Sequence, residues 1–156
     1  MELSAIFKSL GEPAFGELIK SVSIGGLRTY QVYNSFKIHA RLNKVNRESL
    51  RKATPRLWER LGAGDEDLAR ELAHAILICR LPMVVEVLDF LEISHDGNGF
   101  FEKDQSFEGK LEPGWQQRVF DQFREKHPAP LLLLYINHLD REIAEPAEPF
   151  VDGQAK

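Results

Sequence analysis

Residues 83–91 read MVVEVLDFL, and this stretch is the strongest indication of how the chain folds. Wound into a helix, it is apolar on most sides and is interrupted only by Glu86 and Asp89, so we expect it at the centre of the domain. Pro82 precedes it and either kinks a longer helix or opens a new one. The wider apolar run of residues 72–93 is broken by charged residues and by Pro82, so no membrane span is predicted.

Helical patterns continue on both sides of this stretch. Asp65 and the two acids after it stand where the dipole of a helix beginning there favours negative charge. Gly11 and Pro13 separate two short helices near the N-terminus. Asn46 caps another helix, which Pro55 kinks or restarts. The expected helices cover residues 2–10, 13–22, 46–61, 114–126 and 131–143, and residues 65–91 form either one helix kinked at Pro82 or two helices.

Residues 36–43 change the periodicity from that of a helix to that of a strand. Every second residue from Phe36 to Leu42 is apolar, and the residues between are polar, which places four apolar side chains on one face. Residues 27–33 are rich in β-formers, and Asn34-Ser35 between the two runs can turn the chain. A small hairpin is therefore predicted, with a helical structure of the same residues as the alternative.

The length and pattern of the chain together predict the fold class. At 156 residues the chain suits one domain of ordinary size. We expect a mainly α, bundle-like single domain of about six helices with a small N-terminal β-hairpin, and an α+β fold as the alternative. The domain covers residues 1–144, and residues 145–156 have the composition of a frayed C-terminal tail. Residues 62–64, Gly-Ala-Gly, are the best internal boundary.

Cysteine usage and the N-terminus indicate the compartment. The single cysteine, Cys79, excludes an internal disulfide, and its place in an apolar run predicts a buried thiol. A reducing environment suits such a chain. The first residues show neither a basic leader with a long apolar stretch nor a small-residue cleavage site. We therefore expect a cytoplasmic protein.

Charge is distributed unevenly along the chain. The formal net charge is −4, yet residues 20–60 hold ten Lys or Arg against two acids, a net charge of +8. A basic stretch in an acidic protein indicates an anionic surface that it faces. Residues 20–60 are therefore the candidate functional segment.

Periodicity resolves this segment into faces. A strand at residues 36–43 projects Lys37 and Arg41 on one side, and a helix at 46–61 carries two rows of bases at i, i+4 spacing. Acids at 65–67 and Glu71 follow at once and offer intramolecular pairing as the simplest alternative. The candidate partner-binding residues are Lys37, Arg41, Arg47, Arg51, Lys52, Arg56 and Arg60.

Two patterns approach a metal site. Residues 94–105 align to a calcium-binding loop, but Ser94 stands where Asp is required and Gln105 where a bidentate Glu is required. Glu-x-x-His spacing occurs in Glu71 with His74 and in the pair at 92 and 95, and chance accounts for both. No cofactor is predicted.

Catalytic motifs are absent from the sequence. There is no phosphate loop and no nucleophile elbow, and the apolar run around Cys79 is unsuited to an activated thiolate. His138, Asp140 and Glu142 are the nearest scattered set, and the polar side of a C-terminal helix explains them.

These observations predict a non-catalytic interaction module. It docks an anionic protein surface, or a second copy of itself, through the basic segment. A nucleic-acid-binding protein is the alternative, because six or more phosphate contacts are available. A metal-binding protein or enzyme using Glu71 and His74, or the 94–105 loop, ranks lower.

Overall fold

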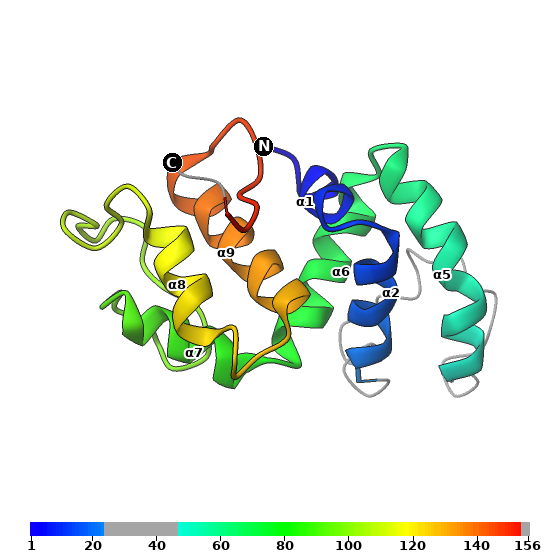
Figure 1. Cartoon of the computed structure of the whole chain (residues 1–156), viewed down its shortest axis with the longest axis horizontal. Coiled ribbons are helices and arrows are strands. Elements are labelled where there is room, and N and C mark those ends of the chain that lie inside the picture. Colours follow the sequence, from blue (N-terminus) through cyan, green and yellow to red (C-terminus); the bar gives the residue numbers. More distant parts are fainter. Residues whose placement is uncertain (24–46, 154–156) are drawn as a thin grey trace. The chain divides into compact units, whose positions relative to one another are not determined.

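The computed structural model describes residues 1–23 and 47–153, and these residues form seven α-helices and no β-strand (Figure 1). The mainly α prediction is confirmed. The hairpin predicted at residues 27–43 lies outside the described residues. The chain divides into two compact units, Met1–Cys79 and Arg80–Lys156. The division falls after the α6 helix, whereas residues 62–64 lie within the first unit, where Gly62 ends α5 and the next two residues form a turn.

Four helices make up the described part of the first unit: α1 (Leu3–Leu10), α2 (Glu12–Ser21), α5 (Arg47–Gly62) and α6 (Glu66–Ile78). Gly11 separates α1 from α2 at φ +90°, a backbone conformation that favours glycine. Phe15 lies at the centre of this unit, with its ring 5.9 Å from that of Phe7 and 5.4 Å from that of Trp58. Each such ring pair adds about 0.5–1.5 kcal/mol to the burial of the side chains.

The two acids that begin α6 have separate structural roles. Asp65 is the N-cap, and its Oδ1 accepts the N–H of Leu68 at 3.0 Å. Glu66 reaches α1, where its two carboxylate oxygens accept the N–H groups of Leu3 and Ser4, each at 2.9 Å. A carboxylate at a helix N-terminus satisfies orphan donors and complements the dipole, so Glu66 stabilises α1 from a distant part of the chain.

The α5 helix continues through Pro55, where the sequence predicts a kink or a restart. The Thr54 hydroxyl donates to the Leu50 carbonyl at 2.9 Å, a hydrogen bond typical of a residue in the interior of a helix. Pro55 has no N–H for the Arg51 carbonyl. Packing compensates for this loss, because Leu50, Leu57 and Leu61 are all buried.

The second unit contains α7 (Leu81–Phe90), α8 (Trp115–Phe123) and α9 (Ala129–Ala144). Pro82 opens α7 in its first turn. The expectation that residues 83–91 fill the centre of the domain is wrong in detail, because Asp89 and Phe90 are exposed and only one face of α7 is buried. The buried residues are Met83, Val84, Val87 and Leu88. Helix α9 contributes the largest number of buried residues in this unit, eight, as its apolar run predicts.

The C-terminal segment returns to α9 instead of fraying over its whole length. Phe150 is only 2% exposed. The Asn137 amide accepts the Phe150 N–H at 2.6 Å and donates to the Phe150 carbonyl at 3.0 Å. Gln117 of α8 adds contacts to Asp152 and Gly153. Two buried or half-buried amides therefore hold a stretch whose composition suggests disorder.

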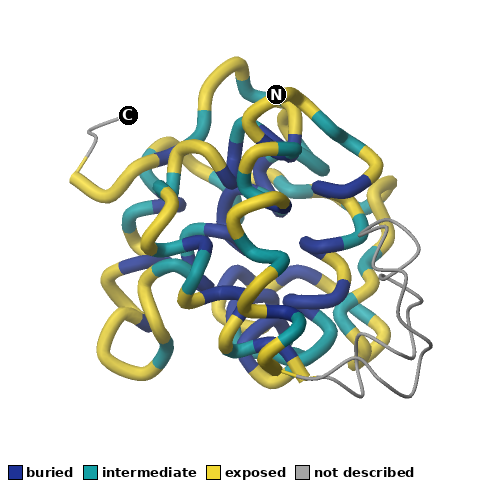
Figure 2. Tube along the Cα trace, turned by 90° about the vertical axis from the view of Figure 1, so that its right-hand side faces the viewer, coloured by how far each residue is buried: buried dark blue, intermediate teal, exposed yellow. Residues whose placement is uncertain are grey.

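Burial follows the helical periodicity. In Figure 2, buried residues recur along the trace with exposed residues between them, as expected for amphipathic helices. Cys79, predicted to be a buried thiol, is only half-buried because it forms the C-cap of α6.

Candidate functional site

The described part of the basic segment lies mainly on α5. This helix holds five basic and two acidic residues, a net charge of +3. Arg47, Arg51, Lys52 and Arg56 are exposed, and Arg60 is half-buried. The two other candidates, Lys37 and Arg41, lie outside the described residues.

Arg60 is neutralised within the fold. Its Nε and Nη2 atoms donate to Oδ2 of Asp65 at 3.0 Å and 2.6 Å. The Arg60 side chain is 26% exposed and the Asp65 side chain 30% exposed. The contact ties the end of α5 to the beginning of α6. The intramolecular pairing considered for the whole segment is thus present at this residue.

The next acids along the chain are engaged elsewhere. Glu66 binds the N-terminus of α1, as described above, and Asp67 pairs with Arg70 at 3.3 Å on the surface of α6. Neither carboxylate forms an ion pair with Arg51 or Arg56. These two carboxylates therefore do not neutralise Arg51 or Arg56 of that helix.

The remaining cations differ in how they are held. Arg47 donates from Nη1 to the Lys20 carbonyl at 2.7 Å, which satisfies the C-terminal end of α2 and leaves the guanidinium charge uncompensated. Lys52 lies 3.6 Å from Glu48, and about 70% of each side chain is exposed, so the pair is weak. Arg51 and Arg56 form no hydrogen bond or ion pair with any residue that the structure describes. Together, Arg47, Arg51, Lys52 and Arg56 are termed the docking residues.

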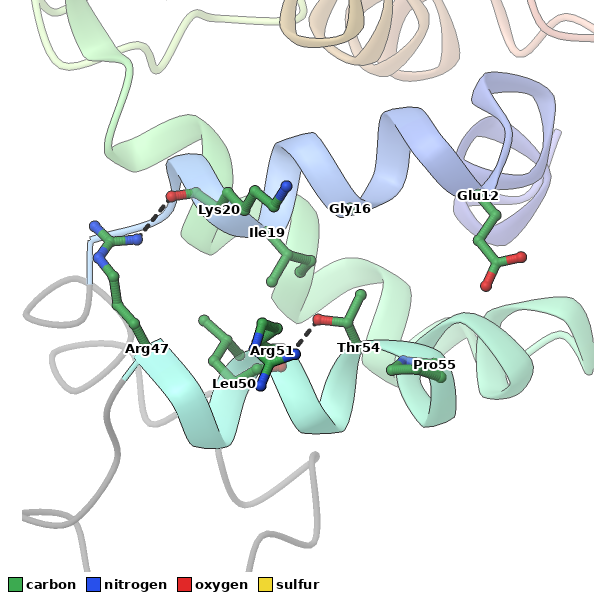
Figure 3. A pocket seen from close by; sticks show the side chains of 9 residues that line it. All are labelled: Glu12, Gly16, Ile19, Lys20, Arg47, Leu50, Arg51, Thr54 and Pro55. Atoms are coloured by element: carbon green, nitrogen blue, oxygen red, sulfur yellow. Dashed lines mark hydrogen bonds between the residues drawn. The ribbon is translucent and has the colours of Figure 1, made fainter.

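A groove lies beside the docking residues, between α2 and α5 (Figure 3). Its volume is about 400 Å³. Ile19 and Leu50, each 3% exposed, form its apolar part. In Figure 3, Arg47 and Lys20 stand at one end and Glu12 at the other. The lining residues are Glu12, Gly16, Ile19, Lys20, Arg47, Leu50, Arg51, Thr54 and Pro55.

Gly16 adds no side chain to this groove. It lies inside α2, and a Cβ atom built on it meets nothing within 4 Å. A glycine inside a helix costs about 1 kcal/mol relative to alanine, and at this position the missing side chain leaves room in the groove. That internal glycine is the signal by which the sequence could have marked the groove, which our sequence analysis missed.

The candidate calcium loop is closed by its own side chains. Gln105 accepts the Ser94 N–H at 2.9 Å and donates to the carbonyls of Ser94 and Glu102 at 3.0 Å and 2.7 Å. Asp96 accepts the N–H groups of Asn98 and Phe100. Gln105 thus makes backbone hydrogen bonds at the position where a calcium loop needs a bidentate carboxylate.

The two Glu-x-x-His pairs differ in structure. Glu71 and His74 share a face of α6, with His74 exposed. Helix α7 ends at Phe90, so Glu92 and His95 are not on a helix at all. Within residues 1–23 and 47–153, no group of three His, Cys, Asp or Glu side chains is placed to hold a metal ion.

The scattered set on α9 does not lie together on a polar face. Asp140 is 3% exposed and accepts a hydrogen bond from Gln116 of α8 at 3.0 Å, so its placement on the polar side is wrong. Burial raises the pKa of Glu142, but the hydrogen bond from Lys103 and neighbouring positive charges outweigh burial and lower it. No residue of this set, nor His74 or His95, lines the α2–α5 groove.

Comparison with known proteins gives no match: no protein-family model, curated protein or solved structure is similar to this chain. Among the helices of the described residues, none is both long and apolar enough to cross a membrane.

Proposed function

We propose that this chain is a non-catalytic interaction module that binds an acidic protein surface through the docking residues of α5. The observation that carries the proposal is that the positive charges of Arg51 and Arg56 are not compensated within the described part of the chain. Both are exposed on one helix and have no acidic partner in the described part of the chain, although the chain as a whole is acidic.

The strength of exposed ion pairs determines how much the docking residues contribute to binding a partner. A single exposed ion pair is worth about 0.2–1 kcal/mol, so one cation would not hold a partner. Several cations on one helix raise the association rate and select a partner of opposite charge. We therefore expect fast binding that weakens as salt is added.

A protein partner is favoured over nucleic acid by the surroundings of the docking residues. Glu48 and Glu59 lie on the same helix, and an apolar groove adjoins Arg47 and Arg51. The carboxylates repel either kind of anionic partner, but a phosphate backbone gains nothing from an apolar groove, whereas an acidic protein segment can also bury an apolar side chain in it.

The experiment compares binding to poly-L-glutamate with binding to a single-stranded and a double-stranded oligonucleotide, at about 50 and about 200 mM salt. Arg56→Glu is tested beside Arg118→Glu, which makes the same charge change at an exposed position of α8. We expect poly-L-glutamate to bind, salt to weaken the binding, and Arg56→Glu to weaken it several-fold more than Arg118→Glu does.

Other outcomes would overturn the proposal. Preferential binding of either oligonucleotide would assign the docking residues to nucleic acid. Failure to bind poly-L-glutamate, or equal losses in the two variants, would remove α5 as a docking surface. Size-exclusion chromatography over a range of concentrations tests for a second copy as partner, since Arg56→Glu would then convert a dimer to a monomer.

A further inference from the structure

We infer that the α2–α5 groove receives one apolar side chain of an acidic peptide, whose neighbouring carboxylates bind Arg47 and Arg51. This inference rests on the proposed function and specifies its partner. The occupant is a peptide segment of a partner protein in which an aromatic or branched apolar residue is flanked by Asp or Glu.

The groove has the chemistry for one apolar side chain. Ile19 and Leu50 line it from the two helices, and Gly16 adds no side chain. A volume of about 400 Å³ falls in the range of pockets that bury ligands, about 300–1,000 Å³. Burying a large apolar side chain there is favourable mainly because the apolar area of the incoming side chain leaves water, since Ile19 and Leu50 are each only 3% exposed already.

The charges at the two ends of the groove determine how the acidic residues of the peptide are oriented. Arg47 is held in place by the Lys20 carbonyl, so its guanidinium loses little freedom on binding a carboxylate. Arg51, one helical turn further, also lines the groove. Glu12 at the opposite end repels acids. The acidic residues of the peptide must therefore lie toward the Arg47 end.

The spacing of the docking residues favours a peptide over a small carboxylate ligand. Arg47 and Arg56 are nine residues apart on one helix, a distance of about 14 Å along its axis. A small carboxylate can reach only one end of this row. A peptide seated in the groove can contact Arg47 and Arg51 and continue along α5 to Arg56.

The test begins with the full chain and a phage-displayed library of random 12-residue peptides. The most enriched peptide is synthesised and its Kd measured by fluorescence anisotropy. Three variants are compared with the wild type: Gly16→Leu, which fills the groove; Gly62→Leu, which adds the same side chain to open space on α5; and Arg51→Glu. Circular dichroism melting confirms that each variant is folded.

We expect enriched peptides to carry an aromatic or branched residue beside Asp or Glu. Gly16→Leu should weaken binding by about tenfold to hundredfold, as loss of one buried apolar side chain implies. Arg51→Glu should weaken it and reduce its salt dependence, and Gly62→Leu should leave it unchanged.

The inference fails if no peptide is enriched, if enriched peptides lack this pattern, or if Gly16→Leu and Gly62→Leu bind alike. Poly-L-glutamate separates the two levels of the proposal. The groove alone is excluded if Gly16→Leu binds the peptide as tightly as the wild type does while the wild type still binds the polymer and Arg56→Glu weakens that binding. The docking residues would then remain as the binding surface. Loss of polymer binding in the wild type would remove both.

Discussion

The side-chain amide of Asn137 pairs with both backbone groups of Phe150, accepting its N–H at 2.6 Å and donating to its carbonyl at 3.0 Å. The same amide also donates to the Leu133 carbonyl of its own helix. Asn137 is fully buried and Phe150 nearly so, which makes this a hydrogen-bond network without competition from water. The segment after α9 is thereby fixed to the second unit.

Replacing Asn137 with Ala should destabilise the protein by about 1–3 kcal/mol, because it leaves the Phe150 backbone groups buried and unpaired. Asn137→Asp should also destabilise it, since a carboxylate can accept from the Phe150 N–H but cannot donate to the carbonyl. Urea unfolding followed by circular dichroism measures both. Gln122→Ala, at an exposed position of α8, is the control. Equal midpoints for Asn137→Ala and the control would show that the amide contributes nothing.

Replacing Glu66 with Ala should cost about 1–2 kcal/mol, because the N–H groups of Leu3 and Ser4 lose a charged acceptor at the start of α1. Hydrogen exchange should accelerate specifically at the first turn of α1. Asp67→Ala removes an exposed carboxylate from the neighbouring position and should change stability by less than about 0.5 kcal/mol. Uniformly faster exchange throughout the first unit would contradict a local capping role.

Gly16→Ala should raise stability by about 0.5–1 kcal/mol, because alanine is the better helix former and its Cβ meets nothing within 4 Å. The opposite sign is expected for Gly64→Ala, since Gly64 has φ +85° and a side chain there is strained. Thermal melting of the two variants beside the wild type compares them directly. A destabilised Gly16→Ala variant would mean that the groove has no room for a methyl group.

Glu86 should make stability depend on pH in the acid range. The hydrogen bonds from Lys126, at 2.8 Å, and His127, at 3.0 Å, lower the pKa of Glu86 below its ordinary value of 4.5. Because the pKa is lower in the folded state, the contribution is present above pH 4.5 and is lost as pH falls through the folded value.

The variant Glu86→Gln tests this dependence. Its free energy of unfolding should be lower than that of the wild type at pH 7, and the difference should shrink as the pH falls below 4.5. Glu125→Gln removes an exposed carboxylate in the same part of the chain and should give no such convergence. A difference between wild type and Glu86→Gln that is constant over this range would exclude the pKa shift.

Local patterns predicted most helices because their causes are local. Gly11 and Pro13 separate α1 from α2, Asp65 caps α6, and Trp115 begins an i, i+4 row in α8 that is buried as its spacing implies. The prediction was wrong where packing outweighs a local signal. At Pro55 the sequence indicated a kink or a restart, and the restart is wrong, because α5 continues through Pro55 with three leucines buried along it.

Burial of polar residues was the other source of error. Asp140 was assigned to a polar face, but Gln116, 24 residues earlier, supplies a hydrogen-bond donor and permits burial. The segment after α9 has a disordered composition, yet Asn137 and the buried ring of Phe150 hold it. Composition alone does not reveal such partners, because each is brought near by tertiary packing.

The sequence by itself determined the helical class, most helix boundaries and the concentration of basic residues between 20 and 60, since these follow from periodicity, capping chemistry and charge along the chain. Only the tertiary structure decided which cations are compensated. It joined Arg60 to Asp65, directed Glu66 to α1, and placed α2 against α5 to form a groove beside Arg47 and Arg51. These outcomes depend on contacts between residues far apart in sequence, whose geometry is set by packing.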